Sequence, residues 1–180
     1  MAADTPRVTH LFTSPAAGER MWSHASVQVV SGLGILGDRY ATRTGHWSAV
    51  EWKDQQLTII AGELLDELGI APPDLRRNIV TRGIDLHDLI GLEFQIGSAI
   101  LRGKRICAPC GYIQRLNQRP GLFKALDGRG GIRVRVVSNG TIAVGDEVRI
   151  LGVGDPIEPD DPSELWTAGT RVVAQGGASA

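Results

Sequence analysis

The only two cysteines of the chain are spaced as C-x-x-C in Cys107-Ala108-Pro109-Cys110. Upstream lies a hydrogen-bonding, cationic run, Arg76-Arg77-Asn78-Ile79-Val80-Thr81-Arg82-Gly83. A thiol ionises more readily near arginines, and arginines hold anionic groups through charge-assisted hydrogen bonds. If the fold brings these two segments together, they form a place for a reactive thiolate beside an anionic ligand.

The spacing of the cysteines is compatible with three kinds of site. A redox pair normally follows a strand in a thioredoxin-like βαβ pattern, which is missing here. Half of a zinc site needs two further ligands, and the four histidines show no ligand-like spacing: His10, His24, His46 and His87. As a third possibility, both cysteines are small, buried core residues.

The two thiols are not equivalent in their sequence context. Pro109 favours the first turn of a helix, which places Cys110 inside that turn. Unpaired amides and the helix macrodipole favour a thiolate there, and arginines such as Arg76, Arg105 or Arg115 would add to this effect if they converge. Cys107 continues the apolar strand end at Ile106 and is expected to be buried. We therefore predict that Cys110 is the functional thiol.

Charge is distributed unevenly along the chain, although the formal net charge is −1. The segment from Arg102 to Arg135 is strongly basic with Asp127 as its one acid, whereas the segment after Val153 is acidic. The basic segment suits an anionic ligand or nucleic acid, or else a solvated strand face. Its only aromatic residues are Tyr112 and Phe123. So few aromatic side chains offer little surface for stacking on bases, and we expect no nucleic-acid partner.

Composition favours one strand-rich domain. A chain of 180 residues can bury a single core, and 23 glycines with 5% aromatic residues indicate many turns and short strands. The N-terminal segment has no apolar signal region, and no apolar run reaches the roughly 18–20 residues that span a bilayer. We expect no membrane association, a cytoplasmic location and free thiols.

Hydrophobic periodicity predicts the elements that must position these residues. Strands are expected at 7–12, 25–30, 56–60, 78–81, 92–96, 99–101, 132–136 and 141–144. Helices are expected at 63–68 closed by Gly69, at 85–90 capped by Asp85, at 109–116 and at 122–126. Asn139-Gly140 predicts a two-residue hairpin. The pattern indicates an α+β, strand-rich domain over 7–152, with a closed or nearly closed barrel, and an acidic tail over 153–180 in which Trp166 docks on the domain.

The order of short motifs along the chain resembles the MOSC family, the domain named after the C-terminal part of molybdenum cofactor sulfurase. The motifs are Gly34-x-x-Gly37-Asp38-Arg39, Arg76-Arg77-Asn78-Ile79, Gly83-Ile84-Asp85, Leu89-x-Gly91-x-x-Phe94-x-Ile96-Gly97, Cys107-x-Pro109-Cys110, Gly130-Gly131 and Gly140-x-Ile142-x-x-Gly145-Asp146. The resemblance extends over 7–151.

The resemblance implies a MOSC-type β-barrel with short peripheral helices. It implies that Cys110 is the family's reactive cysteine, either as thiolate ligand of the metal or as a persulfide. It also implies that Arg76 and Asn78 hold the anionic pterin phosphate of the molybdenum cofactor (molybdopterin), with Arg39, Thr81 and Arg77 as further cofactor-binding residues. Asp38-Arg39 is at the same time expected to form a salt-bridging turn.

Three functions remain open at the level of sequence. The first is a molybdenum-cofactor enzyme that reduces N-hydroxylated compounds with electrons from a separate donor protein. The second is a sulfur carrier that accepts persulfide sulfur on Cys110 from a cysteine desulfurase. The third is a non-catalytic barrel that binds RNA or another anion. No reactive-lysine motif is present, so pyridoxal phosphate is not expected to bind this chain.

Overall fold

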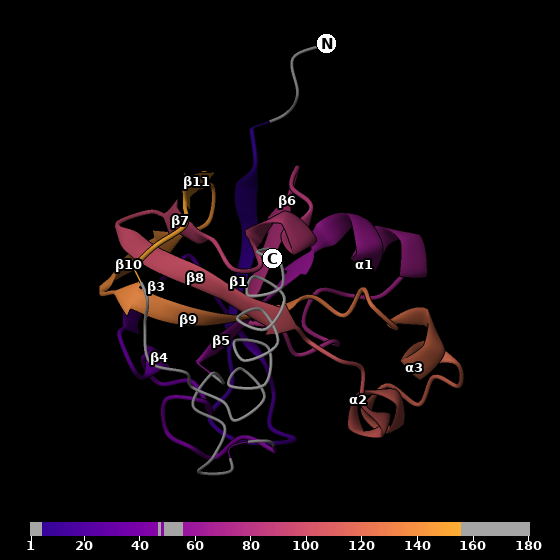
Figure 1. Cartoon of the computed structure of the whole chain (residues 1–180). Coiled ribbons are helices and arrows are strands. Elements are labelled where there is room, and N and C mark those ends of the chain that lie inside the picture. The colour runs from indigo at the N-terminus through magenta and orange to yellow at the C-terminus, as the bar shows by residue number, and fades with distance from the viewer. Residues whose placement is uncertain (1–4, 47, 49–55, 156–180) are drawn as a thin grey trace, which may run out of the picture.

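The computed structural model describes residues 5–46, 48 and 56–155. Within these residues it is rich in short strands and has few helices (Figure 1). In chain order the elements are β1 (Arg7–Thr13), β2 (Trp22–His24), β3 (Ser26–Val30), β4 (Gly34–Ile35), β5 (Leu57–Ala61), α1 (Gly62–Leu68), β6 (Ile79–Arg82), the 3-10 helix η1 (Leu86–Leu89), β7 (Glu93–Ile96), β8 (Ala99–Ile106), α2 (Gly111–Leu116), α3 (Leu122–Ala125), β9 (Ile132–Ser138), β10 (Gly140–Ala143) and β11 (Val148–Gly152).

The strands form a curled sheet that makes a half-barrel. Eight of them are hydrogen-bonded in the order β11-β7-β8-β9-β5-β6-β1-β2, and a smaller sheet has the order β10-β3-β4. β5 and β6 pair in parallel, and α1 lies in the connection between them, as a parallel pair requires. In Figure 1, α1, α2 and α3 gather on one side of the strands. The expected strand-rich fold with short peripheral helices is confirmed.

Two hydrophobic clusters account for this arrangement. Neighbouring residues on one strand belong to different clusters: Leu11 to the cluster inside the half-barrel and Phe12 to the cluster under the helices. Ile59 and Ile60 on β5 divide in the same way. Successive side chains of a strand point to opposite faces, so both faces of these central strands are covered. A polar side chain on them is therefore buried whichever way it points.

Local signals located several helix ends correctly. α1 ends at Gly69, which adopts the left-handed conformation with φ of 59°. Asp85 caps the following short helix by accepting a hydrogen bond from the backbone N–H of His87. That helix is a 3-10 turn, which is the usual form for so short a piece.

The predicted hairpin at Asn139-Gly140 is wrong. β9 pairs with β8 and β5, whereas β10 pairs with β3, so the chain passes from one sheet to the other at Asn139. The Asn139 side chain accepts a hydrogen bond from the Ser31 backbone N–H at 2.8 Å. A Cβ at Gly140 would lie 2.4 Å from the Ala99 nitrogen. Glycine is thus needed here for close backbone approach rather than for a tight turn.

The start of α2 also differs from the prediction. The helix begins at Gly111, and Cys110 is its N-cap with an extended backbone, φ −138° and ψ 152°. Pro109 therefore precedes the helix instead of occupying its first turn. Of the acidic tail expected over 153–180, residues 156–180, with Trp166, lie outside the described residues. No helix in the described part of the chain has the length and apolar character that crossing a membrane requires.

Candidate functional site

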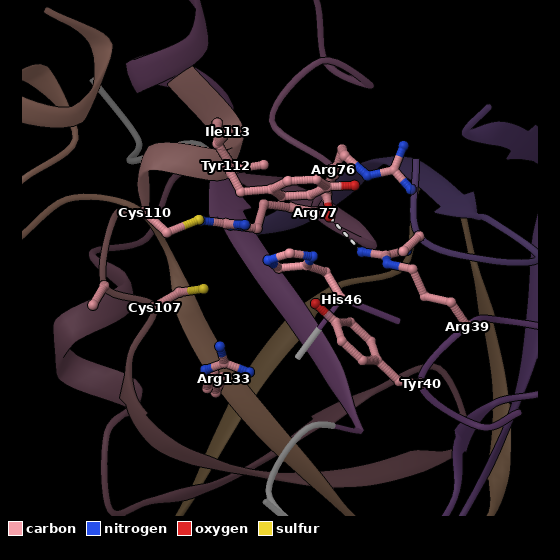
Figure 2. Close-up of a pocket in the computed structure, with 12 residues that line it drawn as sticks. Arg39, Tyr40, His46, Arg76, Arg77, Cys107, Cys110, Tyr112, Ile113 and Arg133 are labelled. Atoms are coloured by element: carbon pink, nitrogen blue, oxygen red, sulfur yellow. Dashed lines mark hydrogen bonds between the residues drawn. The ribbon is translucent and has the colours of Figure 1, made fainter. Parts of the chain in front are cut away.

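A small pocket collects side chains from distant parts of the chain (Figure 2). We call it the thiol–arginine pocket, and its cavity volume is about 40 Å³. Its polar and sulfur-bearing lining consists of Arg39, Arg76, Arg77, Arg133, Cys107, Cys110, Tyr40, Tyr112 and His46. Among the described residues, no Asp or Glu lines it. The structure therefore brings Arg76 and Arg77 of the arginine run together with both cysteines, as the sequence predicted.

The two thiols differ in access. Cys107 is 3% exposed, and its backbone N–H donates to the Gly131 carbonyl at 2.7 Å. Cys110 is partly buried at the start of α2, where it packs on the cluster under the helices. Both sulfurs lie on the same side of the pocket in Figure 2. A reagent or ligand entering the pocket therefore reaches Cys110 with less rearrangement than Cys107.

Arg76 is held by several hydrogen bonds to the protein. Its backbone has φ of 57°, a left-handed conformation that is uncommon outside glycine. Its guanidinium donates to the Glu19 carbonyl at 2.5 Å, the Ser14 hydroxyl at 3.1 Å and the Ala16 carbonyl at 3.2 Å. Burial, and then the neighbouring charge of Arg39, lower the pKa of Arg76. Arg76 thus holds the 14–19 loop against the pocket as well as facing the cavity.

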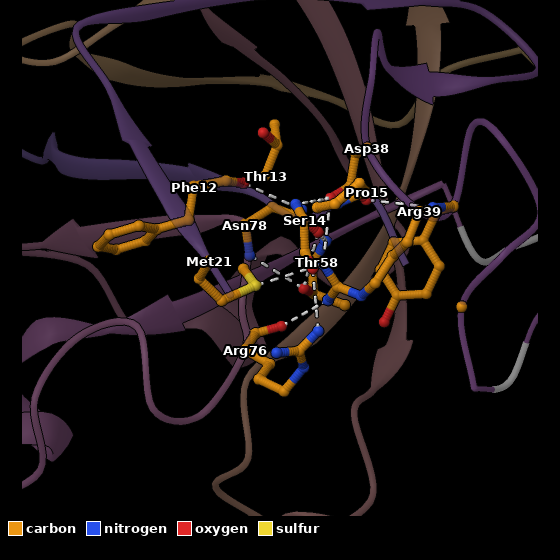
Figure 3. Close-up of polar contacts among 12 residues, drawn as sticks. Phe12, Thr13, Ser14, Pro15, Met21, Asp38, Arg39, Thr58, Arg76 and Asn78 are labelled. Atoms are coloured by element: carbon orange, nitrogen blue, oxygen red, sulfur yellow. Dashed lines mark hydrogen bonds and ion pairs between the residues drawn. The ribbon is translucent and has the colours of Figure 1, made fainter. Parts of the chain in front are cut away.

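Asp38 and Arg39 form a buried ion pair next to Arg76 (Figure 3). The Asp38 carboxylate accepts from Arg39 at 3.0 Å and from the Ser14 backbone N–H at 2.9 Å. Arg39 also donates to the Arg76 carbonyl at 2.7 Å, and its guanidinium lies 4.5 Å from the Tyr40 ring centroid. The expected salt-bridging turn is confirmed, and it also fixes the backbone of Arg76.

Arg77 links the arginine run to the segment before β9. Its Nε donates to the Gly130 carbonyl at 2.8 Å, and a terminal nitrogen donates to the Leu75 carbonyl at 3.2 Å. A Cβ on Gly130 would lie 2.5 Å from the Cys107 carbonyl, so the backbone there runs close beside the thiol segment. Arg77 thereby connects the arginine run to the Gly130 segment, which lies beside Cys107.

Asn78 and Thr81 do not line the pocket. Asn78 is fully buried, and its side-chain oxygen accepts from the Thr58 backbone N–H and hydroxyl, each at 3.1 Å. Its amide nitrogen donates to the Phe12 carbonyl at 3.2 Å, so it joins β1 and β5 at the start of β6. Thr81 is 1% exposed within β6. The structure therefore brings together Arg39, Arg76, Arg77 and Cys110 but leaves these two residues in the sheet.

Sequence reasoning missed four lining residues: Tyr40, His46, Tyr112 and Arg133. The rings of His46 and Tyr112 are stacked, with centroids 4.2 Å apart and planes within 2°. Arg133 was expected only as part of an alternating basic strand. Its one sequence signal is a charge that alternates with apolar residues from Ile132 to Val136, and that signal equally fits a solvent-facing side chain.

The described residues do not form a metal site made of several protein ligands. Within residues 5–46, 48 and 56–155, no group of three or more His, Cys, Asp and Glu side chains is placed to hold a metal ion. Any metal brought to the thiol–arginine pocket would take Cys110 as its accessible thiol ligand there, because Cys107 is buried.

Comparison with known proteins places this geometry in context. The family model described as MOSC domain matches residues 46–149. A search of curated proteins gives no significant match.

Solved structures share the fold at low identity. YuaD protein from Bacillus subtilis is 20% identical, with a TM-score of 0.65 over 84% of this chain and 97% of its own. YiiM from Geobacillus stearothermophilus is 17% identical, with a TM-score of 0.62 over 81% and 75%. YiiM from Escherichia coli is 14% identical, with a TM-score of 0.59 over 88% and 76%.

Proposed function

The chain belongs to the MOSC domain family, and from this premise we propose that it binds the molybdenum cofactor with Cys110 as the thiolate ligand of the metal. We further propose that it reduces N-hydroxylated compounds with electrons from a separate donor protein. The observation that carries the proposal is the lining of the pocket. A partly buried thiol opens into a cavity faced by four arginines, with no Asp or Glu from the described residues.

The donor set fits such a cofactor. A thiolate is a soft ligand of the kind that transition metals in sulfur-rich sites accept. Guanidinium groups held in a buried setting are suited to the phosphate of a pterin cofactor, because they form charge-assisted and bidentate hydrogen bonds. Arg39, Arg76 and Arg77 are the family-matched residues that line the pocket and would hold it. When bound, the cofactor would supply the two-electron chemistry of the reduction.

The residues of the chain itself contribute binding and orientation. The carbonyl and hydroxyl partners of Arg76 and the Asp38 partner of Arg39 hold these guanidinium groups in fixed positions before any ligand arrives. An anion entering the pocket meets preorganised donors in a setting of low dielectric, where each charge-assisted hydrogen bond is stronger than in water. Asn78 contributes indirectly, because its hydrogen bonds anchor the start of β6 directly after Arg76 and Arg77.

Metal analysis of protein made in a host that produces the cofactor tests the proposal. The wild-type chain should retain molybdenum in a near-stoichiometric amount, and so should Cys107→Ser. Cys110→Ser should lose most of it while keeping the same thermal midpoint. Molybdenum-free wild-type protein, or equal retention by Cys110→Ser, would contradict the proposal.

A second function has its own observation in favour. The cavity volume of about 40 Å³ is small against the roughly 300–1,000 Å³ of typical ligand pockets, but it suits one added sulfur atom. In a sulfur carrier, the Cys110 thiolate attacks the outer sulfur of a cysteine desulfurase persulfide. The sulfur–sulfur bond of the donor breaks, and its cysteine leaves as a thiolate. Mass spectrometry after incubation with a loaded desulfurase should then show one added sulfur on wild-type protein and none on Cys110→Ser.

A further inference from the structure

Arg133 differs from every other arginine of the thiol–arginine pocket. It is 9% exposed, and its Nε and one terminal nitrogen are buried without a hydrogen-bond partner in the described part of the chain. Arg39, Arg76 and Arg77 each donate to oxygen atoms of the protein. Burying a guanidinium whose N–H groups have no acceptor costs free energy, because burial removes the hydration of its charge.

The strands on either side of Arg133 supply no compensating charge. β9 runs between β8 and β5, and the register sets Arg133 opposite Arg105 on one side and Thr58 on the other. Like charges directly opposite each other across a strand pair are destabilising. The lining of the pocket adds no carboxylate from the described residues. Among the described residues, no carboxylate of this lining therefore neutralises the Arg133 guanidinium.

Size and direction indicate what that anion is. The Arg133 guanidinium faces the same cavity as Cys107 and Cys110, on the Cys107 side in Figure 2. A volume of about 40 Å³ exceeds the roughly 10–15 Å³ that one water molecule requires, so it suits a compact oxyanion. The planar fork of a guanidinium matches two oxygens of a phosphate group. The Tyr112 hydroxyl is a further buried group in this lining that has no partner among the described residues.

We infer that Arg133 is the phosphate-binding residue of the thiol–arginine pocket and holds the phosphate group of a bound ligand beside the cysteines. The inference deepens the proposed function by assigning a phosphate-bearing ligand to the same site. It makes Arg133 the main contact of the phosphate and leaves secondary contacts to Arg39, Arg76 and Arg77, which already donate to oxygen atoms of the protein. The phosphate can belong to the cofactor or to the substrate.

Binding of inorganic phosphate to the cofactor-free protein tests this directly by calorimetry. Arg133→Met should weaken phosphate binding roughly ten- to hundredfold, which corresponds to the loss of charge-assisted hydrogen bonds. Its thermal midpoint without phosphate should equal or exceed that of the wild type, because no internal partner is lost. Arg133→Lys keeps the charge without the fork and should bind with intermediate affinity.

Arg77→Met is the matched control for a structural role. It removes donors to the Gly130 and Leu75 carbonyls, so it should lower the thermal midpoint of the phosphate-free protein. Unchanged phosphate affinity in Arg133→Met would overturn the inference, as would a midpoint that falls as far as that of Arg77→Met. If Arg133→Met does not fold, Arg133→Lys decides: affinity equal to wild type overturns the inference, and weaker binding upholds it.

The same titration distinguishes the source of the phosphate and separates this inference from the proposed function. Loss of phosphate binding once the protein carries the cofactor assigns the site to the cofactor phosphate, and retained binding assigns it to the substrate. If the protein never acquires molybdenum but binds phosphate through Arg133, the molybdenum proposal fails and the Arg133 assignment holds.

Discussion

Two pockets formed by the described residues differ in volume and in the charges of their lining side chains. The thiol–arginine pocket has a volume of about 40 Å³ and four arginines in its lining. A second cavity, which we call the His87 pocket, measures about 470 Å³ and is lined by Ala61, Glu63, Leu64, Glu67, Gly83, Ile84, Asp85, Leu86, His87, Arg129, Gly131 and Ile132. By volume alone the second is the better ligand site.

The polar groups of the His87 pocket are matched within the protein. Glu63 accepts from the Gly83 backbone N–H at 2.8 Å, and Glu67 pairs with Arg129 at 3.0 Å. His87 bonds to Asp85 at 2.9 Å and to the Gly128 carbonyl at 2.9 Å. The contrast shows that the proposed function rests on the unsatisfied charge of the thiol–arginine pocket and not on the larger space of the His87 pocket.

The largest expected effect comes from Gly131, which lines the His87 pocket and accepts a hydrogen bond from Cys107 of the other. It has φ of +90°, and a Cβ there would lie 2.1 Å from the Ile59 carbonyl oxygen. Gly131→Ala should lower the free energy of unfolding by about 3 kcal/mol or more, through strain and backbone displacement together. Denaturant unfolding measures the change.

Gly121→Ala is the matched control, since Gly121 has φ of +84° with no atom within 4 Å of the added Cβ. It should cost about 1–2 kcal/mol from the left-handed backbone alone. Equal losses of unfolding free energy in both variants would show that the close contact of Gly131 with β5 does not add to the cost. Gly131 would then not couple the two pockets through the sheet.

The sequence predicted those parts of the fold whose signals are local. Gly69 and Asp85 end and begin their helices through their own side-chain chemistry, so both were found. Asn139-Gly140 was misread because the same dipeptide serves a two-residue turn and a close approach to Ala99, and only the register of distant strands decides. Local pattern carries no information about which sheet the following strand joins.

Prediction of the site divides in the same way. Residue type and motif order were enough to propose a cationic thiol site, and Cys110 does lie in one pocket with Arg76 and Arg77. Arg133 was missed because alternation on β9 predicts a solvent face, whereas β9 lies between β8 and β5 and Arg133 is buried near its start. Asn78 was expected at the ligand, but its amide is engaged with Thr58 and Phe12, which depends on strand pairing that sequence does not show.

Arginines of the two pockets should respond differently to truncation. Arg76→Met removes buried hydrogen bonds to the 14–19 loop and should lower the free energy of unfolding by roughly 1–3 kcal/mol. Arg129→Met in the His87 pocket removes an ion pair whose side chains are 45% and 58% exposed, so the loss should stay below about 1 kcal/mol. Thermal unfolding of both variants measures the difference. Equal losses of stability would show that the buried hydrogen bonds of Arg76 contribute no more than the exposed ion pair of Arg129.

Alkylation sharpens the comparison within the thiol–arginine pocket itself. Cys110 should react with iodoacetamide at least about tenfold faster than Cys107, because the buried thiol needs local opening of the structure first. Peptide mass spectrometry after timed quenching gives both rates. Cys107→Ser should keep the fast phase and Cys110→Ser should lose it. A faster Cys107 would show that the entrance lies on its side of the pocket and would place the functional thiol there.

The smallest effect is a pH dependence confined to the His87 pocket. The hydrogen bond to Asp85, together with that to the Gly128 carbonyl, raises the pKa of His87 above its ordinary value. Hydrogen bonds from the backbone N–H and ring of His87 lower the pKa of Asp85. The raised histidine pKa stabilises the fold below the unfolded value, near pH 6.5, and this contribution disappears as pH rises through the folded pKa. The depressed carboxyl pKa stabilises it above the unfolded value, near pH 3.8, and this contribution disappears as pH falls through the folded pKa.

His87→Gln should therefore reduce the free energy of unfolding most between these two limits, at about pH 5, and least at about pH 8. The reduction should stay below about 1 kcal/mol, because both side chains are at least half exposed and water screens the pair. Urea unfolding at the two pH values measures it, and Asp88→Asn on the same helical turn is the control, since Asp88 is only a minor influence on the His87 ring. A loss that is larger at the higher pH would mean that the Gly128 contact, made by a neutral ring, dominates. The stability contributed at the His87 pocket would then come from the hydrogen bond to the Gly128 carbonyl rather than from the charges of His87 and Asp85.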